Sequence, residues 1–154
     1  MKIIFLDIDG VLCIPGHFGP IETRNLGGHM VHTFNTDCVQ RLNKIVDVSG
    51  ASIVISSAWR IDFWASEEFE MLKEFLKSQG MTGDVIDHTP YDDEGIRGRE
   101  IQTWLTERPE VKKFVIIDDS NDMEHLMPYL VRTQFFHGIQ DEHIDAALKM
   151  LEEP

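Results

Sequence analysis

The sequence predicts an α/β protein with a mostly parallel central sheet. Short apolar runs rich in β-branched residues alternate along the chain with longer runs whose apolar residues recur at helical spacing. Glycine, proline and other turn-forming residues separate these runs. Three of the apolar runs end directly in polar side chains, and ligands of parallel sheets bind at the carboxyl ends of the strands.

The first half of the chain predicts two strands, a hairpin segment and two helices. Residues 2–8 are β-branched and aromatic, which favours a buried strand. Residues 10–34 contain five of the eleven glycines and two of the six prolines, which favours a loop or hairpin. We then expect a helix capped by Asn35 or Thr36 and running to about Val48, a strand at 52–56, and a helix from Ser66 to Gly80.

The second half predicts three further strands and three helices. The strands fall at 85–86, 114–117 and 133–136, and the helices at 98–107, 124–130 and 141–151. The strand at 114–117 leads directly into Asp118 and Asp119, and the strand at 133–136 is the last one along the chain. Because no repeat, low-complexity tract or linker interrupts the chain, residues 1–154 predict one domain, with 10–34 as a hairpin flap inserted in it.

The composition excludes several classes of protein. Hydrophobic residues make up 42% and charged residues 27%, as in a globular protein. The 14 basic and 27 acidic residues give a net charge of −13, which argues against general nucleic-acid or membrane-surface binding but permits a small basic site. The apolar run after Lys2 stops at Asp7, too early for a signal peptide, and no run has the roughly 18 apolar residues of a membrane span. Cys13 and Cys38 predict reduced thiols and a cytoplasmic location.

Acidic side chains at the predicted strand ends indicate a metal site. Asp7 lies near the end of the first predicted strand and points into the crevice, and Asp9 lies just beyond the strand, where Gly10 permits a sharp turn. Asp119 would join them from another strand. Such a cluster is unfavourable unless a divalent cation neutralises it, and oxygen ligands favour Mg²⁺, which also bridges to phosphate.

Two further residue types point to a phosphate ester as the substrate. Ser56 offers a hydroxyl at the same sheet edge, and Arg97 or Arg99 offers a positive charge at the start of a helix. Taken alone, each motif also has a structural interpretation: D-x-D-G is common at strand-to-turn junctions, and serines cap helices. The pair His29 and His32 does not predict a metal site, because in an extended segment these side chains point to different sides.

Four segments resemble, in order, the motifs of the haloacid dehalogenase-like (HAD) phosphohydrolases. F-L-D-I-D-G-V-L at 5–12 is similar to the first motif and I-V-I-S-S at 53–57 to the second. R-G-R-E-I at 97–101 stands in the place of the third, and V-I-I-D-D-S at 115–120 resembles the fourth. More narrowly, I-S-S-A-W-R at 55–60, R-G-R-E-I-Q-T-W-L at 97–105 and I-I-D-D at 116–119 resemble the HAD domains of Swiss Army Knife RNA-repair proteins.

The resemblance implies a Rossmann-like three-layer sandwich and a role for each matching residue. Asp7 would be the nucleophile and a metal ligand, and Asp9 the general acid and base, with its backbone carbonyl in the metal shell. Asp119 would bind Mg²⁺, with Asp118 beside it or as a further ligand. The phosphate-binding candidates are Ser56, Ser57, and Arg97 or Arg99, where the family usually has lysine.

These roles predict a Mg²⁺-dependent phosphomonoesterase with an aspartyl-phosphate intermediate. Asp7 would attack phosphorus, and Asp9 would protonate the leaving alcohol and then activate water. A small-molecule phosphatase for nucleotides or sugar phosphates is one alternative. A dehalogenase is disfavoured because a departing halide does not need the proton of Asp9, and a non-catalytic binding or regulatory module is disfavoured by the complete acidic set.

The segments between the motifs are too short for the cap domain that many relatives carry. We therefore expect a capless architecture with an open cleft, which suits a phosphate at the end of a polynucleotide. Arg60 and Arg97 would supply local positive charge there. For Arg60, a role as an ordinary surface residue is the alternative. The net charge of −13, by contrast, favours a small substrate. We expect neither a membrane nor an obligate protein partner.

Overall fold

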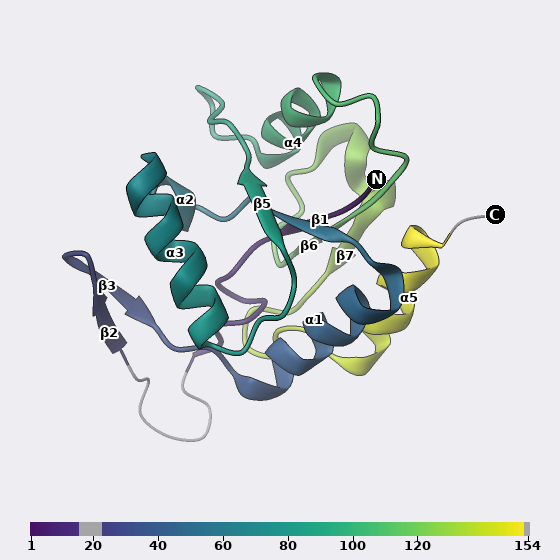
Figure 1. Ribbon diagram of the computed structural model, residues 1–154. Coiled ribbons are helices and arrows are strands. Elements are labelled where there is room, and N and C mark those ends of the chain that lie inside the picture. Colours follow the sequence, from purple (N-terminus) through teal and green to yellow (C-terminus); the bar gives the residue numbers. More distant parts are fainter. Residues whose placement is uncertain (16–22, 153–154) are drawn as a thin grey trace.

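The central sheet has five parallel strands in the order β5-β4-β1-β6-β7 (Figure 1). The computed structural model describes residues 1–15 and 23–152. The strands are β1 (Lys2–Leu6), β4 (Ser52–Ile55), β5 (Val85–His88), β6 (Lys113–Asp118) and β7 (Leu130–Arg132). Helices cover both faces of this sheet, so the predicted α/β three-layer fold is confirmed.

The two faces of the sheet are covered by different helices because side chains alternate along each strand. Ile4, Leu6 and Ile53 point to the face covered by α1 (Thr36–Ser49), α3 (Ser66–Ser78) and α5 (Asp141–Leu151). Phe5 and Val54 point to the opposite face, which is covered by α4 (Arg97–Thr106) and the 3₁₀ helix η1 (Glu124–Tyr129). Both sets of side chains are fully buried, so the sheet lies between two apolar layers.

Helix α4 is held at a fixed height over the sheet. Trp104 packs edge-on against Phe5, with ring centroids 5.4 Å apart, and its indole N–H donates a 2.7 Å hydrogen bond to Asp87 of β5. At the other end of the helix, Gly98 lies against the backbone of Met123, where a Cβ would stand 2.3 Å from the Met123 carbonyl oxygen. Glycine therefore lets the first turn of α4 approach the loop that follows β6.

A β-hairpin lies within the segment 10–34 that the sequence analysis assigned to a flap. Strands β2 (Thr23–Leu26) and β3 (His29–His32) pair antiparallel, next to α3 in Figure 1. The ring of His29 lies 5.1 Å from that of Phe63, in the turn after the short helix α2 (Trp59–Asp62). Part of the predicted flap, residues 16–22, lies outside the described residues.

One predicted strand is wrong, and one observed helix was not predicted. The strand expected at 133–136 is wrong: the last strand is Leu130–Arg132, and residues 134–138 form a turn closed by a bridge between Gln134 and Gly138. The adjacent residues Phe135 and Phe136 are typical of a buried strand in sequence, yet both side chains are exposed. Helix α2 was not expected, because its four residues are too few to show helical periodicity.

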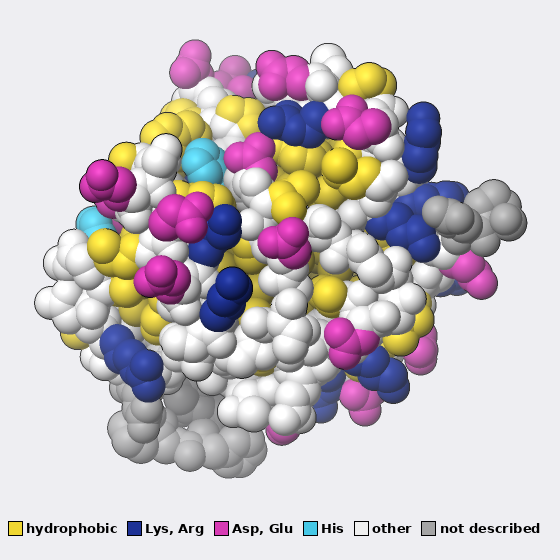
Figure 2. Space-filling view, viewed as in Figure 1, with side chains coloured by type: hydrophobic (Ala, Val, Ile, Leu, Met, Phe, Trp, Pro, Cys, Tyr) yellow, Lys and Arg dark blue, Asp and Glu magenta, His cyan; other side chains and the backbone are white. Residues whose placement is uncertain are grey.

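The surface seen in Figure 2 mixes charges of both signs, with Lys and Arg interspersed among Asp and Glu. Cys13 and Cys38 are buried, and neither forms a disulfide bond. Among the helices of the described residues, none is both long and apolar enough to cross a lipid bilayer.

Candidate active site

Three polar side chains gather under the N-terminus of α4 because of strand alternation. Asp7 follows Phe5 by two positions and Ser56 follows Val54 by two, so both point to the α4 face. Asp118 follows Ile116 in the same way at the end of β6. Since β4, β1 and β6 are neighbours and parallel, their carboxyl ends bring these three residues into one row.

Asp7, Asp118 and Asp119 form a carboxylate cluster. One oxygen of each lies within 4.8 Å of the others. Asp7 and Asp118 are buried, and Asp119 is partly buried. Burial and the adjacent Asp118 raise the pKa of Asp7 well above its ordinary value, and burial raises the pKa of Asp119. The chain thus concentrates negative charge that its own residues only partly neutralise.

Arg97, at the first position of α4, is the cation of this cluster. Its Nη1 lies 2.6 Å from Asp118 Oδ2 and 3.4 Å from Asp7 Oδ1. Although burial opposes the charged form, Asp7 and Asp118 raise the pKa of Arg97 above its usual value. One guanidinium therefore bridges two of the three carboxylates.

Arg97 is held in place by an acidic residue that the sequence analysis missed. Asp122 Oδ2 accepts a hydrogen bond from the Arg97 backbone N–H at 3.2 Å, and its Oδ1 accepts one from the Ser120 hydroxyl at 2.7 Å. Ser120 N–H in turn donates to Asp118 Oδ1 at 2.9 Å. Although burial works in the opposite direction, these donors lower the pKa of Asp122. The run D-D-S-N-D in the sequence was the available signal for this loop.

Gly10 allows the acidic cluster to close. Its φ of +79° suits glycine, and a Cβ there would lie 2.7 Å from Asp119 Oδ2 and 3.0 Å from the Phe135 ring. The Gly10 carbonyl accepts a 2.7 Å hydrogen bond from the Thr133 hydroxyl, which fixes the turn after β1. Any larger residue would push Asp119 away from Asp7.

Asp9 lies outside the carboxylate cluster. Its side chain is exposed, and its Oδ2 accepts a 3.0 Å hydrogen bond from the Trp59 indole N–H. A pocket of about 330 Å³ opens beside it. Its lining consists of Asp9, Cys13, Ile14, Pro15, His32 and Phe135. Asp9 therefore stands between the acidic cluster and a mostly apolar cavity of the size that small ligands occupy.

The two adjacent serines have different surroundings. Ser57 Oγ accepts a 3.1 Å hydrogen bond from the backbone N–H of Trp59, the first residue of α2. The Ser56 hydroxyl is buried, yet it has no hydrogen-bond partner among the described residues, and the same holds for the Thr89 hydroxyl. Buried polar groups are nearly always hydrogen-bonded, so an orphaned hydroxyl at a strand end indicates a place for a ligand.

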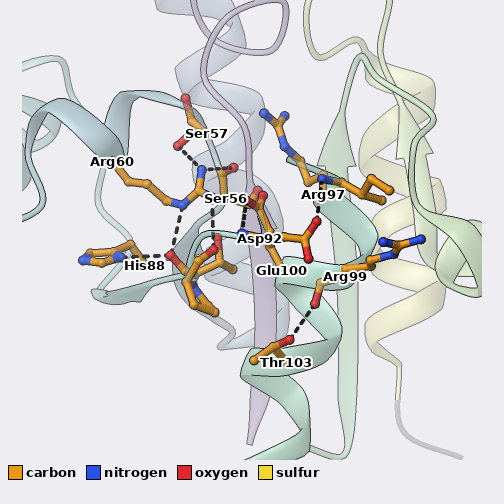
Figure 3. A network of polar contacts seen from close by, with 12 residues as sticks. Ser56, Ser57, Arg60, His88, Asp92, Arg97, Arg99, Glu100 and Thr103 are labelled. Atoms are coloured by element: carbon orange, nitrogen blue, oxygen red, sulfur yellow. Dashed lines mark hydrogen bonds and ion pairs between the residues drawn. The ribbon is translucent and has the colours of Figure 1, made fainter. Parts of the chain in front are cut away.

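Of the two candidate arginines at the start of α4, only Arg97 reaches the acidic cluster. Arg99 forms ion pairs with Glu94 and Glu124 at 3.3 and 2.9 Å, on the surface. Figure 3 shows the two side chains leaving α4 in different directions.

The expectation that Arg60 contacts substrate phosphate or the surface is wrong. Arg60 is only 1% exposed, and its donors are occupied by backbone carbonyls and by Glu100. The sequence could not reveal this, because the acceptors come from two strand ends and a distant helix.

The donor set of the carboxylate cluster fits a hard divalent cation. Asp7, Asp118 and Asp119 offer only oxygen atoms, close together and in excess of the nearby positive charge. Mg²⁺ prefers such carboxylate ligands and keeps water or phosphate oxygens in its other positions. Together with the Ser56 hydroxyl and Arg97, these residues can bind a phosphate group and place a carboxylate beside it.

A comparison with known families agrees with this arrangement. The model of the "HAD domain in Swiss Army Knife RNA repair proteins" matches residues 3–144, which span all five strands of the sheet and every residue of the site. Neither the curated proteins nor the solved structures gave a match. With a match over most of its length, the chain belongs to the family of HAD domains found in Swiss Army Knife RNA repair proteins.

Proposed function

We propose that this protein is a Mg²⁺-dependent phosphomonoesterase that uses Asp7 as its nucleophile. The observation that carries the proposal is the cluster of Asp7, Asp118 and Asp119 under Arg97, next to the orphaned hydroxyl of Ser56. Burying several carboxylates together is unfavourable for folding, so a cluster that is retained suggests a functional use. Family membership supports a phosphohydrolase as that use.

The residues divide the reaction between them. The Asp7 carboxylate attacks phosphorus, so that a bond to one Asp7 oxygen forms while the bond to the leaving oxygen breaks. Arg97 and the Ser56 hydroxyl stabilise the negative charge on the transferred phosphoryl oxygens. Asp9 protonates the leaving oxygen and later takes a proton from the water that hydrolyses the aspartyl-phosphate. One of its oxygens accepts a hydrogen bond from Trp59, which leaves the other for this proton transfer.

The cation would be held by Asp7, Asp118 and Asp119, with the Asp9 backbone carbonyl as a further candidate ligand. When bound, Mg²⁺ offsets the repulsion between the Asp7 carboxylate and the phosphate dianion. Arg97 alone cannot do this, because it is already shared between Asp7 and Asp118.

The test is hydrolysis of p-nitrophenyl phosphate by the wild type and by Asp7→Asn. We expect activity that needs Mg²⁺ and disappears with EDTA, and a loss of at least 1000-fold in Asp7→Asn, because the amide keeps the shape but not the nucleophile. Near-full activity in Asp7→Asn, or in exhaustively chelated wild type, would overturn the proposal. An inactive wild type would favour the non-catalytic binding module.

For the substrate we propose a phosphorylated nucleic-acid end. The family's description links its members to RNA repair. The described segments between β1 and α1 and between β4 and α4 form a hairpin, the helices α2 and α3 and the strand β5, and thus no separate cap domain over the site. A large substrate can itself cover such an open site, and the pocket beside Asp9 would take the part of it next to the leaving oxygen.

The substrate proposal is tested by kcat/KM for a 3′-phosphorylated oligoribonucleotide against free 3′-nucleotides and sugar phosphates. We expect the oligonucleotide to be preferred at least tenfold. A preference for the small esters would leave the enzyme a small-molecule phosphatase, which is what the charge of −13 favours.

A further inference from the structure

Arg60 has contacts with every nitrogen of its guanidinium, although it does not belong to the carboxylate cluster. Its Nε donates to the Thr89 carbonyl at 3.0 Å, and its Nη1 donates to the carbonyls of Ser56 and Ser57 at 3.1 and 2.9 Å. Its Nη2 donates to the Pro90 carbonyl at 3.1 Å and lies 2.8 Å from Glu100 Oε2. These contacts use all five N–H groups of a guanidinium.

The acceptors of Arg60 belong to three separate elements. Ser56 and Ser57 follow β4, and Thr89 and Pro90 follow β5. Glu100 lies on the first turn of α4, three residues after Arg97. Figure 3 shows the Arg60 guanidinium beside Ser56 and Ser57, with Glu100 nearby. Arg60 therefore joins two strand ends to the helix that carries the cation of the site.

The Glu100 carboxylate extends this connection along the chain. Its Oε2 also accepts a hydrogen bond from the Asp92 backbone N–H at 3.1 Å, and Asp92 Oδ2 accepts one from Ile96 N–H at 3.3 Å. The loop that leads into α4 is thus tied to the same ion pair. Both charged side chains are almost fully buried, at 2% and 4% exposure.

Removing two charges from water is unfavourable, and apolar residues of similar volume often stabilise a fold as well or better. A buried ion pair that bonds mainly to backbone carbonyls thus suggests a positioning role. Ile55 pairs with His88, so the following residues, Ser56 and Thr89, are neighbours and both point to the α4 face. Their hydroxyls are the two buried side-chain groups without a partner among the described residues.

We propose that Arg60 and Glu100 form a positioning pair that fixes the Ser56 hydroxyl relative to Arg97. This inference rests on the proposed phosphatase function, because Ser56 and Arg97 are the phosphate-binding groups of that proposal. The pair sets the distance between a strand end and a helix start, and neither of its members contacts phosphate. Thr89 places a second hydroxyl in the same row.

The test is a double-mutant cycle between Arg60→Lys and Ser56→Ala, measured as kcat/KM for p-nitrophenyl phosphate with Mg²⁺. Lysine keeps the charge but has three donors on a single atom, so it cannot hold all of these carbonyls. We expect Arg60→Lys to lose at least tenfold, and Ser56→Ala to cost much less in the Arg60→Lys background than in the wild type. A merely structural role for Arg60 predicts the same fold-loss for Ser56→Ala in both backgrounds.

Two further variants complete the design. Arg41→Lys is the matched control. Like Arg60, Arg41 donates hydrogen bonds to a backbone carbonyl and to a carboxylate, here those of Ile139 and Asp141, but it lies on the face of the sheet covered by α1 and α5. It should stay within twofold of wild-type activity. If Arg60→Lys fails to fold, as judged by thermal melting, Glu100→Gln replaces it in the cycle, since the amide has the shape of the carboxylate and lacks its charge.

Orthophosphate binding, measured by calorimetry in the presence of Mg²⁺, separates this inference from the proposed function. An inactive wild type contradicts the phosphatase proposal. Orthophosphate binding then still tests the Arg60–Glu100 pair, because we expect Arg60→Lys to weaken phosphate affinity at least threefold and Arg41→Lys to leave that affinity unchanged. Unchanged binding and activity in Arg60→Lys, or equal Ser56→Ala losses in both backgrounds, overturn the positioning role.

Discussion

At the scale of single residues, the site separates two carboxylates of the same motif by their surroundings. Asp7 is buried under Arg97, while Asp9 is exposed, bonds to Trp59 and borders the pocket. A buried carboxylate held by a cation suits attack, and one that reaches solvent suits proton transfer. Asp7 and Asp9 are only two positions apart, and the turn that follows β1, which ends at Leu6, places their carboxylates in different environments.

Asp9→Asn should distinguish good from poor leaving groups. The amide oxygen can still accept from Trp59, but the side chain cannot donate a carboxylic proton. We expect a small loss of kcat/KM, within about tenfold, for p-nitrophenyl phosphate, and a loss of at least 100-fold for an alkyl phosphate. Steady-state kinetics on both esters check this. Equal losses on the two substrates would remove Asp9 from the general-acid role.

The sequence predicted most of the residues near the site, and its failures are instructive. Asp7, Ser56 and Asp118 could be found because each follows an apolar run that predicts a strand, and the carboxyl ends of parallel strands meet at one edge of the sheet. Arg60 could not be assigned, since its partners Thr89 and Glu100 are 29 and 40 positions away in the chain. Asp122 was missed because its role depends on the close approach of α4 that Gly98 permits.

At the scale of elements, side-chain caps mark the starts of α1 and α5, whereas α3 and α4 begin without one. Of the two predicted caps, Asn35 and Thr36, it is Asn35 that caps α1, by accepting a 3.0 Å hydrogen bond from Cys38 N–H. Helix α5 begins with a less obvious pair: Gln140 accepts from the backbone of His143, and His143 Nδ1 accepts from Gln140 N–H at 2.8 Å. The strand at 133–136 was wrong because exposure, which depends on the tertiary fold, decides whether an aromatic pair is part of a core.

The α5 cap should make stability depend on pH. Burial lowers the pKa of His143 below its ordinary value, so the folded protein binds this proton less readily than the unfolded chain. The contribution of the cap is therefore full above the unfolded pKa of about 6.5 and is lost as the pH falls through the lowered pKa of the folded state. Its size should be about 1 kcal/mol or less, because the side chain is only partly buried.

The measurement compares thermal melts of the wild type and His143→Gln at pH 7.5 and pH 5, both in EDTA. Glutamine keeps an acceptor but does not titrate. We expect the wild type to lose more stability than the variant between the two pH values. If the wild type and the variant lose the same stability between the two pH values, the neutral imidazole of His143 does not stabilise the cap as a hydrogen-bond acceptor.

At the scale of the whole molecule, the acidic residues at the carboxyl edge of the sheet lower the stability of the metal-free fold, and a bound cation would restore it. Asp7, Asp118 and Asp119 repel one another in the metal-free protein. We expect Asp7→Asn to raise the melting temperature in EDTA, and Mg²⁺ to raise it more in the wild type than in the variant. A difference of about 1 kcal/mol corresponds to roughly 2–4 °C in a chain of this size. Differential scanning fluorimetry checks both shifts, and a wild type indifferent to Mg²⁺ would contradict the metal assignment.

The charge distribution of the whole molecule limits how a polynucleotide can bind. The net charge is −13, and basic side chains on the face in Figure 2 are interspersed with acidic ones. Arg60 is buried, and Arg97 is paired with Asp7 and Asp118, so neither can neutralise a distant phosphate. A nucleic-acid end should therefore be recognised through its terminal phosphate and the adjoining nucleotide alone.

Salt dependence measures the number of phosphates contacted. For single strands, the logarithm of affinity falls with the logarithm of salt concentration by about 0.7 for each phosphate neutralised. With contacts confined to the terminal phosphate and its neighbours, we expect the slope of log kcat/KM to be no steeper than about −2. Lengthening a 3′-phosphorylated oligoribonucleotide beyond three nucleotides should change kcat/KM less than twofold. The salt dependence of p-nitrophenyl phosphate hydrolysis serves as the control for effects on the chemistry itself. A steeper slope, or a steady gain with length, would reveal an extended basic track and contradict recognition confined to the end.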